Sequence, residues 1–195
     1  METVRGEDWY GRDLAGLTWQ DTSFVDVDLT EVRSESAVWN RCTFERVRFN
    51  VSEHADSAFA NCVFRDCSFF DATFTRCKLV GSRFEGCEFS LLTIEGGNWS
   101  FVDLGKAQLE SVTVNGAKFR EADFTGAHCV GASFIECDLS AADLTGADFT
   151  SARLVGSDMN GADLADVRMR GTIIDERQAA QLAEAQGLIV VPATT

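Results

Sequence analysis

The chain of 195 residues contains little proline, little histidine and little positive charge. It has one Pro, two His, and 17 Lys and Arg against 31 Asp and Glu, which gives a formal net charge of −14. Because binding to DNA normally takes cationic side chains that neutralise phosphates, we expect no nucleic-acid ligand. The scarcity of proline favours a fold that needs backbone N–H donors along its whole length.

Long apolar runs and catalytic motifs are also missing. No stretch of eighteen apolar residues is present, so we expect no membrane span. The first ten residues, METVRGEDWY, lack the apolar stretch of a signal peptide, so we expect a cytoplasmic protein. The chain has no phosphate-binding loop, zinc-protease helix, nucleophile elbow or dinucleotide fingerprint. We therefore expect no enzymatic activity, no cofactor and no metal.

What the chain does contain is a period of five residues. The stretch SAADLTGADFTSARLVGSDMNGADLADV, residues 140–167, repeats a small, a polar and a large apolar residue followed by two others. Neither a helix nor a strand has this period. The large residues, here called centres, stand at positions ending in 4 or 9, and the frame never shifts between Leu14 and Ile174. Only Ser34 and His54 are polar centres.

Small residues and glycines keep the same frame. Two residues before each centre stands a small residue, most often Ala or Cys, so small and large side chains alternate on the inside. Thirteen of the sixteen Gly stand two residues after a centre, where a sharp turn needs a positive φ. One corner every five residues gives four sides per coil of twenty. The sequence thus predicts a square solenoid of about eight coils.

The units GADFT, AADLT and GADLA resemble the Ala-Asp/Asn-Leu-x-x pattern of pentapeptide-repeat proteins. The resemblance covers roughly residues 10–174 and implies an all-β fold, a right-handed quadrilateral β-helix. We expect two parts: residues 1–174 form the pentapeptide-repeat β-helix with an N-terminal lead-in, and residues 175–195 form a C-terminal cap.

The seven cysteines follow this frame and form no C-x-x-C pair. Cys42 and Cys62 are twenty residues apart, as are Cys67 and Cys87, so each pair is expected to stack on neighbouring coils about 4.8 Å apart. That spacing permits a disulfide, but the expected compartment is reducing. We therefore expect buried thiols that pack as small apolar groups.

The acidic residues form rows, because residues twenty apart lie on the same side of a coil. Such rows place carboxylates about 4.8 Å apart. This regular spacing of negative charge resembles that of the phosphates along DNA. Asp at this position can also serve solubility and local turn bonds, and that alternative stays open. We expect a partner-binding acidic surface made of Asp103, Asp123, Asp143, Asp163, Asp138, Asp158, Asp148 and Glu136.

Residues 57–104, from SAFANCVFRDC to GGNWSFVDL, resemble the mycobacterial fluoroquinolone-resistance subgroup of the family, the Mfp type. The resemblance implies a DNA mimic that binds DNA gyrase, inhibits it and protects it from fluoroquinolones or similar gyrase poisons. The related plasmid-borne Qnr proteins carry projecting loops, for which the unbroken frame here leaves no room. The alternative is a structural or scaffolding repeat protein whose acids only keep it soluble. The gyrase subunit contacted, and the choice between drug resistance, toxin self-protection and supercoiling regulation, stay open.

The C-terminus departs from the repeat. Asp175 with Gln178 three residues on is typical of a helix start, and Gly187 is typical of a helix end. An apolar strand is expected to follow at residues 188–191. A helix here would cover the open edge of the last coil. The resemblance further implies a homodimer through this end, for which we expect contacts from Leu182, Leu188, Ile189 and Val190.

The polar centres Ser34 and His54 are neighbours on one side of adjacent coils. The sequence predicts a local bulge or a partly hydrated patch at this point, or else a contact surface for a partner.

Overall fold

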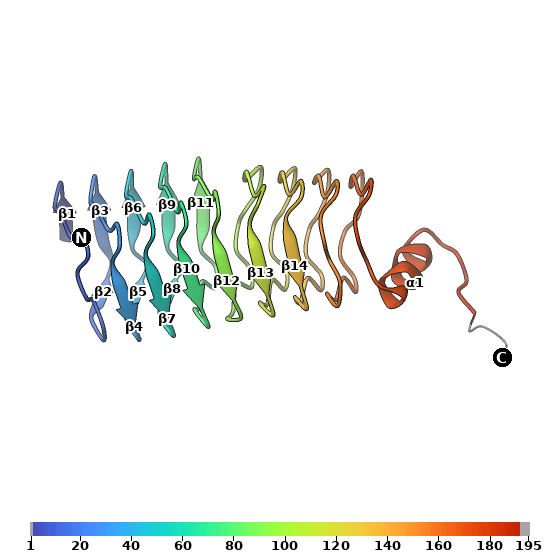
Figure 1. Ribbon diagram of the computed structural model, residues 1–195, viewed down its shortest axis with the longest axis horizontal. Helices are drawn as coiled ribbons and strands as arrows, with labels where there is room; N and C mark the ends of the chain where they lie inside the picture. The colour runs from blue at the N-terminus through green and yellow to red at the C-terminus, as the bar shows by residue number, and fades with distance from the viewer. Residues whose placement is uncertain (1, 192–195) are drawn as a thin grey trace.

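The computed structural model describes residues 2–191, which form a straight stack of four-sided coils that ends in one helix (Figure 1). Residue 1 and residues 192–195, the last four of the expected C-terminal part, lie outside the described residues. The expected all-β quadrilateral β-helix with a short C-terminal helix is confirmed. The described residues include no helix that is long and apolar enough to cross a membrane.

Three parallel sheets and one row of single bridges make the four faces, and each face pairs residues twenty apart. Face 1 contains β1 (Glu2–Arg5), β3 (Thr22–Val25), β6 (Thr43–Glu45), β9 (Val63–Arg65) and β11 (Arg83–Glu85). Within residues 2–191, face 2 has no strands and is held by bridges from Asp8↔Asp28 to Asp148↔Arg168. Face 3 contains β4 (Arg33–Glu35), β7 (Glu53–Ala55), β10 (Thr73–Thr75), β12 (Thr93–Glu95), β13 (Thr113–Asn115) and β14 (Ser133–Ile135). Face 4 contains β2 (Thr18–Gln20), β5 (Val38–Asn40) and β8 (Ala58–Ala60).

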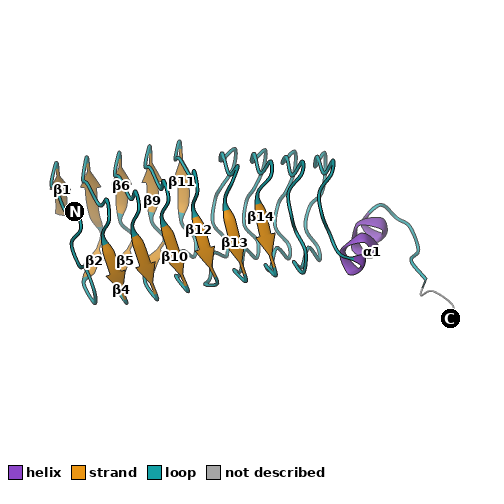
Figure 2. Cartoon of the chain, viewed as in Figure 1, coloured by secondary structure: helices purple, strands orange, loops and turns teal. Residues whose placement is uncertain are grey.

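Strands occupy the N-terminal and middle coils, while the last coils are drawn entirely as turns and loops (Figure 2). The difference lies in the corner that follows each centre. In a strand-type corner the chain stays extended past the centre, as in β11. In a tight corner the N–H three residues after the centre donates to the centre's own carbonyl, as Ala107 N–H does to Leu104 at 3.0 Å. Both corners take five residues, so the repeat frame passes through unchanged.

The corners require a left-handed backbone in every repeat. Each residue from 6 to 171 whose number ends in 1 or 6 has a positive φ. Glycine fills thirteen of these places, as expected, and the others hold side chains such as Asp, Glu and Arg. Val51, Leu91 and Phe101 also adopt this conformation, at φ of 58°, 61° and 61°. A β-branched or bulky residue is seldom found there, because its Cβ crowds the backbone.

The core is the predicted column of centres. Phe24, Phe44, Phe64 and Phe84 stack face to face along face 1, with ring centroids 4.7–5.0 Å apart. Leu104 follows them in the next coil, and from there on the centres are mostly smaller aliphatic residues. Burying each such side chain contributes about 1.5–3 kcal/mol. The frame is also confirmed by its exceptions, because the off-frame Phe70 and Phe101 are exposed.

The C-terminal helix α1 (Glu176–Ala185) begins and ends as the sequence predicts. The Asp175 side chain accepts the N–H of Gln178 at 2.9 Å, and the Gln178 side chain accepts the N–H of Asp175 at 2.8 Å. Gly187, at φ +82°, then donates to Glu184, and Leu188 donates to Ala183, which is a Schellman ending.

The strand expected at residues 188–191 is absent from the described chain, so that prediction is wrong. A strand needs a neighbour to pair with, and the left-handed turn at Gly187 directs the chain away from the last coil (Figure 1).

Candidate partner-binding surface

The acidic surface expected from the sequence is assembled on three faces of the C-terminal half. Asp103, Asp123, Asp143 and Asp163 pair in register along face 1. Asp138 and Asp158 are bridge partners on face 4, and Asp148 lies on face 2 beside Arg168. Glu136 lies at a corner, with a φ of 53°, and is exposed. The predicted rows are therefore present, wrapped around the rod rather than confined to one side.

Each aspartate in these rows has a structural task at its own corner. One carboxylate oxygen accepts the backbone N–H two residues on, at 2.7 Å for Asp123, 2.9 Å for Asp143 and 3.0 Å for Asp163. Hydrogen bonds from Thr145 hold the pKa of Asp143 below its usual value, and bonds from Thr150 do the same for Asp148. The turn bond thus fixes one oxygen of each carboxylate at its corner.

Charge is arranged differently in the two halves of the rod. In the N-terminal half, acids pair with an arginine one coil away. Asp21 binds Arg41 at 2.7 Å, and Asp56 binds Arg76 at 2.5 Å. The same spacing of twenty residues joins Asp26 to Arg46, Asp28 to Arg48, Arg33 to Glu53, and Arg65 to Glu85. Ion pairs are thus concentrated in the N-terminal half, although residues 1–97 and residues 98–195 each carry a formal net charge of −7.

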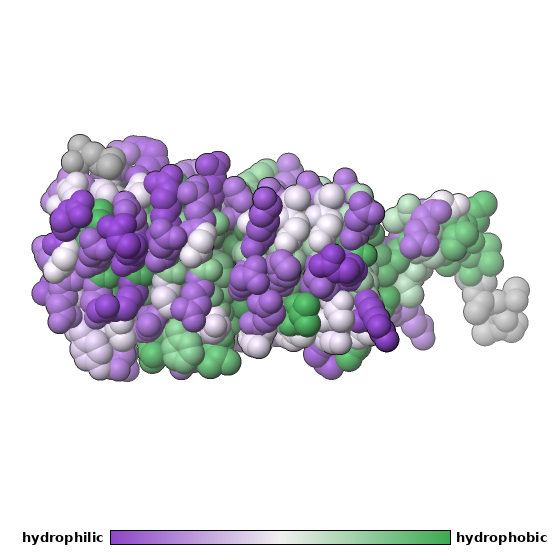
Figure 3. Space-filling model, turned by 90° about the horizontal axis from the view of Figure 1, so that it is seen from above, coloured by the Kyte–Doolittle hydropathy of each residue, from purple (hydrophilic) through white to green (hydrophobic). Residues whose placement is uncertain are grey.

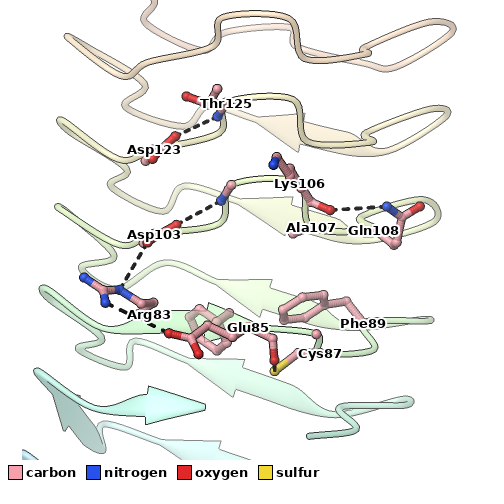
Figure 4. Close-up of a pocket in the computed structure, with 13 residues that line it drawn as sticks. Arg83, Glu85, Cys87, Phe89, Asp103, Lys106, Ala107, Gln108, Asp123 and Thr125 are labelled. Atoms are coloured by element: carbon pink, nitrogen blue, oxygen red, sulfur yellow. Dashed lines mark hydrogen bonds and ion pairs between the residues drawn. The ribbon is translucent and has the colours of Figure 1, made fainter. Parts of the chain in front are cut away.

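Two of the expected partner-binding aspartates are themselves paired. Arg83 Nε lies 3.2 Å from the outer oxygen of Asp103, and Arg168 Nε lies 3.0 Å from that of Asp148. Figure 4 shows Arg83 between Asp103 and Glu85, at the wall of a groove of about 770 Å³ that Asp123 also lines. Among the described residues, Asp123, Asp143, Asp163, Asp138 and Asp158 have no cationic partner within ion-pair distance.

Sequence reasoning missed this pairing, although a signal was present. Opposite charges exactly one coil apart, such as Asp26 and Arg46, are visible as a spacing of twenty in the sequence. Because most of these side chains are substantially exposed, the contribution of each pair to stability is small. Its effect on the surface potential is larger, since a paired carboxylate presents little net charge to a partner.

The polar centres Ser34 and His54 form neither a bulge nor a surface patch. Both are buried, and they keep register with Phe74. His54 Nδ1 lies 2.6 Å from the Ser34 hydroxyl, and Nε2 lies 3.0 Å from that of Ser52. The ring also stacks on Phe74, with centroids 4.7 Å apart. The network satisfies its own polar atoms inside the tube, so it offers no site to a partner.

The cysteines form no site either. All seven are free, and six are buried. The thiols instead donate to core carbonyls, as Cys77 does to the carbonyl of His54 at 3.3 Å. Burial raises the pKa of Cys77 to about 11, which keeps it a neutral thiol. Residues 2–191 contain no group of three His, Cys, Asp or Glu placed to hold a metal ion.

The C-terminal end of the rod is apolar and partly open. The inward residues of the last coil, among them Leu164, Val167 and Met169, are only half-buried. A groove of about 730 Å³ separates them from Leu182 and Ala185 of α1. Beyond the helix, Leu188, Ile189 and Val190 are exposed, Ile189 at 90%. Green surface marks this end in Figure 3.

Known proteins share both the repeat and the fold. Residues 67–144 match the family described as Pentapeptide repeat region, and residues 132–171 match Pentapeptide repeats (8 copies). The pentapeptide repeat protein MfpA of Mycobacterium tuberculosis is 33% identical over 103 residues, which is 50% of this chain and 56% of that protein. MfpA of Mycolicibacterium smegmatis is 40% identical over 57 residues, which is 29% of this chain and 27% of that protein.

Two solved structures match nearly the whole chain in fold. A trypsin-treated form of QnrB1, a plasmid-mediated fluoroquinolone resistance protein, gives a TM-score of 0.73 at 24% identity, covering 97% of this chain and 98% of that one. HetL, a pentapeptide repeat protein involved in heterocyst differentiation regulation in the cyanobacterium Nostoc, gives 0.74 at 20% identity, covering 89% and 87%. At these identities the likeness concerns the fold. The two repeat matches together span residues 67–171, more than half of the chain, and with the coil geometry they show that this chain belongs to the pentapeptide-repeat proteins.

Proposed function

We propose that this protein is a DNA mimic that binds DNA gyrase, inhibits it and thereby protects it from fluoroquinolones or similar gyrase poisons. The observation that carries the proposal is the set of unpaired carboxylates on the C-terminal half, above all Asp123, Asp143 and Asp163. The sequence relation to MfpA and the shared fold with QnrB1 support it.

The spacing of these carboxylates suits binding to the surface with which a partner protein normally binds DNA. Successive coils place them about 4.8 Å apart, against one charge per about 3.4 Å along each DNA strand. Like charges so close repel one another, and this chain offsets such repulsion in its N-terminal half by pairing with arginine. Its C-terminal half keeps the repulsion, which favours a partner with positive charge and a fast, salt-sensitive encounter.

The proposal includes a symmetric dimer through the C-terminal end. The open groove between the last coil and Leu182, and the exposed residues Leu188, Ile189 and Val190, are apolar surface that a second copy would cover. Eight coils at about 4.8 Å give roughly 40 Å per subunit and roughly 80 Å for the dimer. The two acidic halves would then meet at the middle of the rod.

In this role the protein is a binding protein of the cytoplasm. It acts as a competitor of DNA, and the proposal assigns it no catalytic step, no cofactor and no nucleic-acid ligand of its own.

The test is a gyrase supercoiling assay titrated with purified protein. Wild type is expected to inhibit in competition with DNA, and Asp123→Asn/Asp143→Asn/Asp163→Asn together should inhibit at least ten-fold less well at low salt. The fold should stand, because an amide oxygen can accept the same turn bond, as that of Asn98 already does from Ser100 N–H at 3.0 Å.

A matched control removes the same charge from the other half of the rod. Asp21→Asn/Asp26→Asn/Asp56→Asn also changes the net charge by three, but at aspartates that are paired with arginine. It should inhibit as wild type does. Equal loss in both variants would reduce the effect to net charge, and no inhibition by wild type would overturn the proposal.

A structural or scaffolding role is the second candidate, and one observation favours it. Each aspartate of the rows accepts a backbone N–H at its own corner, so turn formation alone explains why Asp is there. The fold shared with HetL fits such a role as well. Salt separates the two functions, because binding through the acidic rows should weaken steeply as ionic strength rises.

A further inference from the structure

An exposed apolar ridge runs along the edge between faces 2 and 3. Val51, Phe70 and Leu91 come from three successive coils there and are 42%, 41% and 52% exposed. Backbone bonds hold the coils together at this edge, with Val51 N–H donating to the Phe70 carbonyl at 2.8 Å. Figure 3 shows green surface along one edge of the N-terminal half as well as at the C-terminal end.

The ridge is costly to the fold, which suggests that it serves another purpose. Val51 and Leu91 both have the left-handed corner conformation, where most other corners hold Gly or a polar residue such as Asp, Arg or Ser. A branched or bulky side chain in that region is strained, and about half of its surface stays exposed to water here. Strain and exposure at neighbouring positions together point to a contact surface.

Beside Leu91 the rod opens along face 2. Between residues 86–91 and 105–110 the coils stay in register through the bridge Glu88↔Gln108. The four backbone bonds that join successive coils elsewhere on this face do not reach normal hydrogen-bond geometry in this pair, so only the weaker contacts of the bridge join the two coils there. One coil earlier all four are present, for example Phe69 N–H to Glu88 and Asp71 N–H to Ser90. Among the described residues, neither Leu91 N–H nor the Glu110 carbonyl makes a backbone hydrogen bond.

A change of corner explains the opening. The corner after Phe84 is the extended strand type, whereas the corner after Leu104 is tight, so the two backbones follow different paths. The resulting hollow of about 350 Å³ is lined by Leu91, Phe89 and the carboxylates Glu88 and Glu110.

The acidic residues around the ridge favour a partner with positive charge. Asp71 lies between Val51 and Leu91 along the edge, and Glu88 and Glu110 border the hollow. Arg48 on face 2 is already paired with Asp28. We propose that this ridge and hollow bind a segment of a partner protein that presents a large apolar side chain between basic residues. The apolar side chain enters the hollow, and the basic neighbours meet Glu88 and Glu110.

This surface lies apart from the carboxylate rows, so it goes beyond the proposed gyrase contact and can stand or fall alone. The probe is a fluorescein-labelled hexapeptide with Leu-Phe between two pairs of lysines, compared with the same peptide carrying Ala-Ala. Fluorescence anisotropy on the full chain should show the Leu-Phe peptide binding at least ten-fold more tightly. The Ala-Ala peptide measures attraction to the acidic rod in general.

The test variant is Phe70→Ser/Leu91→Asn, which should lose that preference. Both side chains are exposed, and Asn tolerates the left-handed corner, so the fold should stand, as urea denaturation will verify. Phe101→Asn is the matched control, because Phe101 is an equally exposed left-handed corner residue on another edge. It should bind as wild type does, and Glu88→Gln/Glu110→Gln should weaken binding of the Leu-Phe peptide.

Three results would overturn the proposal. One is equal affinity of wild type for the two peptides. Another is a preference for Leu-Phe that survives in Phe70→Ser/Leu91→Asn. The third is a wild-type assembly, seen by light scattering, that this variant dissolves, because the occupant of the ridge would then be a second copy of the chain.

Discussion

At the scale of single residues, His54 shows how the tube accommodates a polar centre. Three serine hydroxyls, of Ser34, Ser52 and Ser57, connect to the ring directly or through one another. The imidazole occupies the place of a Phe in the stack and lies against Phe74. Burial lowers the pKa of His54 from 6.5 to about 3, because the charged form would lose its hydration. The sequence predicted polar centres at Ser34 and His54, but it could not show that serine hydroxyls bond both ring nitrogens inside the tube.

The protonation of His54 predicts a pH dependence of stability. In the unfolded chain, His54 is protonated below pH 6.5, whereas in the folded protein it is protonated only near pH 3. Stability therefore falls as pH falls from 6.5 to 3. By pH 4.5 the loss should reach about 2–3 kcal/mol. Urea denaturation at pH 7 and pH 4.5 measures it. Paired carboxylates such as Asp26 titrate lower, since their pKa is depressed by Arg46, and contribute little in this range.

Two variants isolate the effect. His54→Phe should remove the slope, and it leaves the serines partnered, since Ser52 still donates to the Phe49 carbonyl and Ser34 still meets Ser57. His128→Gln changes the other histidine and should keep the wild-type slope. The same slope in His54→Phe as in wild type would assign the dependence to other groups.

At the scale of the coil, the sequence predicted nearly everything that depends on the five-residue frame. The buried centres, the small inward positions and the left-handed corners all follow from side-chain size and from where the chain must turn. The type of corner could not be predicted, because strand-type and tight corners use the same number of residues and similar side chains. The strand at 188–191 was wrongly predicted for a related reason, since apolar composition does not supply a neighbour for pairing.

Where a strand-type corner is followed one coil later by a tight corner, some backbone groups lose their usual partners. A serine hydroxyl bonds these groups at two such places, and at a third no serine is present. The Ser82 hydroxyl accepts Cys62 N–H at 2.9 Å and donates to Phe59. Ser157 does the same for Cys137 and Phe134, at 2.9 Å each. On face 1 the corresponding position is Ala107, which has no hydroxyl for Cys87 N–H and the Phe84 carbonyl.

Ala107→Ser should therefore stabilise the protein. Its hydroxyl would bond Cys87 N–H and the Phe84 carbonyl, at about 0.5–1.5 kcal/mol per bond. Ala127→Ser, one coil on in the same column, is the control. There Ala107 N–H already donates to Leu104, so a buried hydroxyl finds no such pair and should destabilise. Urea denaturation compares the two, and a gain no larger at 107 than at 127 would contradict this account of the opening.

At the scale of the whole molecule, the two halves of the rod differ in ion pairing and in core. Its N-terminal half has stacked aromatic rings inside and ion pairs between coils outside. Its C-terminal half has smaller centres inside and unpaired carboxylates outside. The sequence predicted the rows of Asp123, Asp143 and Asp163, because a period of twenty fixes which residues are neighbours. It did not reveal that Asp103 and Asp148 are paired, since that depends on the reach of arginine side chains.

The length of the DNA-like surface depends on whether the proposed dimer forms. Ile189 is 90% exposed, so Ile189→Asp should leave one chain folded while placing a charge in the proposed interface. Light scattering at micromolar concentration should give twice the 21.3 kDa of one chain for wild type and a single chain for the variant. Leu17→Asp, at an exposed apolar residue near the other end, should remain dimeric. Truncation after Thr172 should also give single chains. A wild-type monomer would contradict the dimer and halve the acidic rod from roughly 80 Å to roughly 40 Å, about one turn of duplex DNA. The rows of Asp143 and Asp163 would then end at an open apolar edge, so the inhibition assay on a monomer would test one acidic half alone.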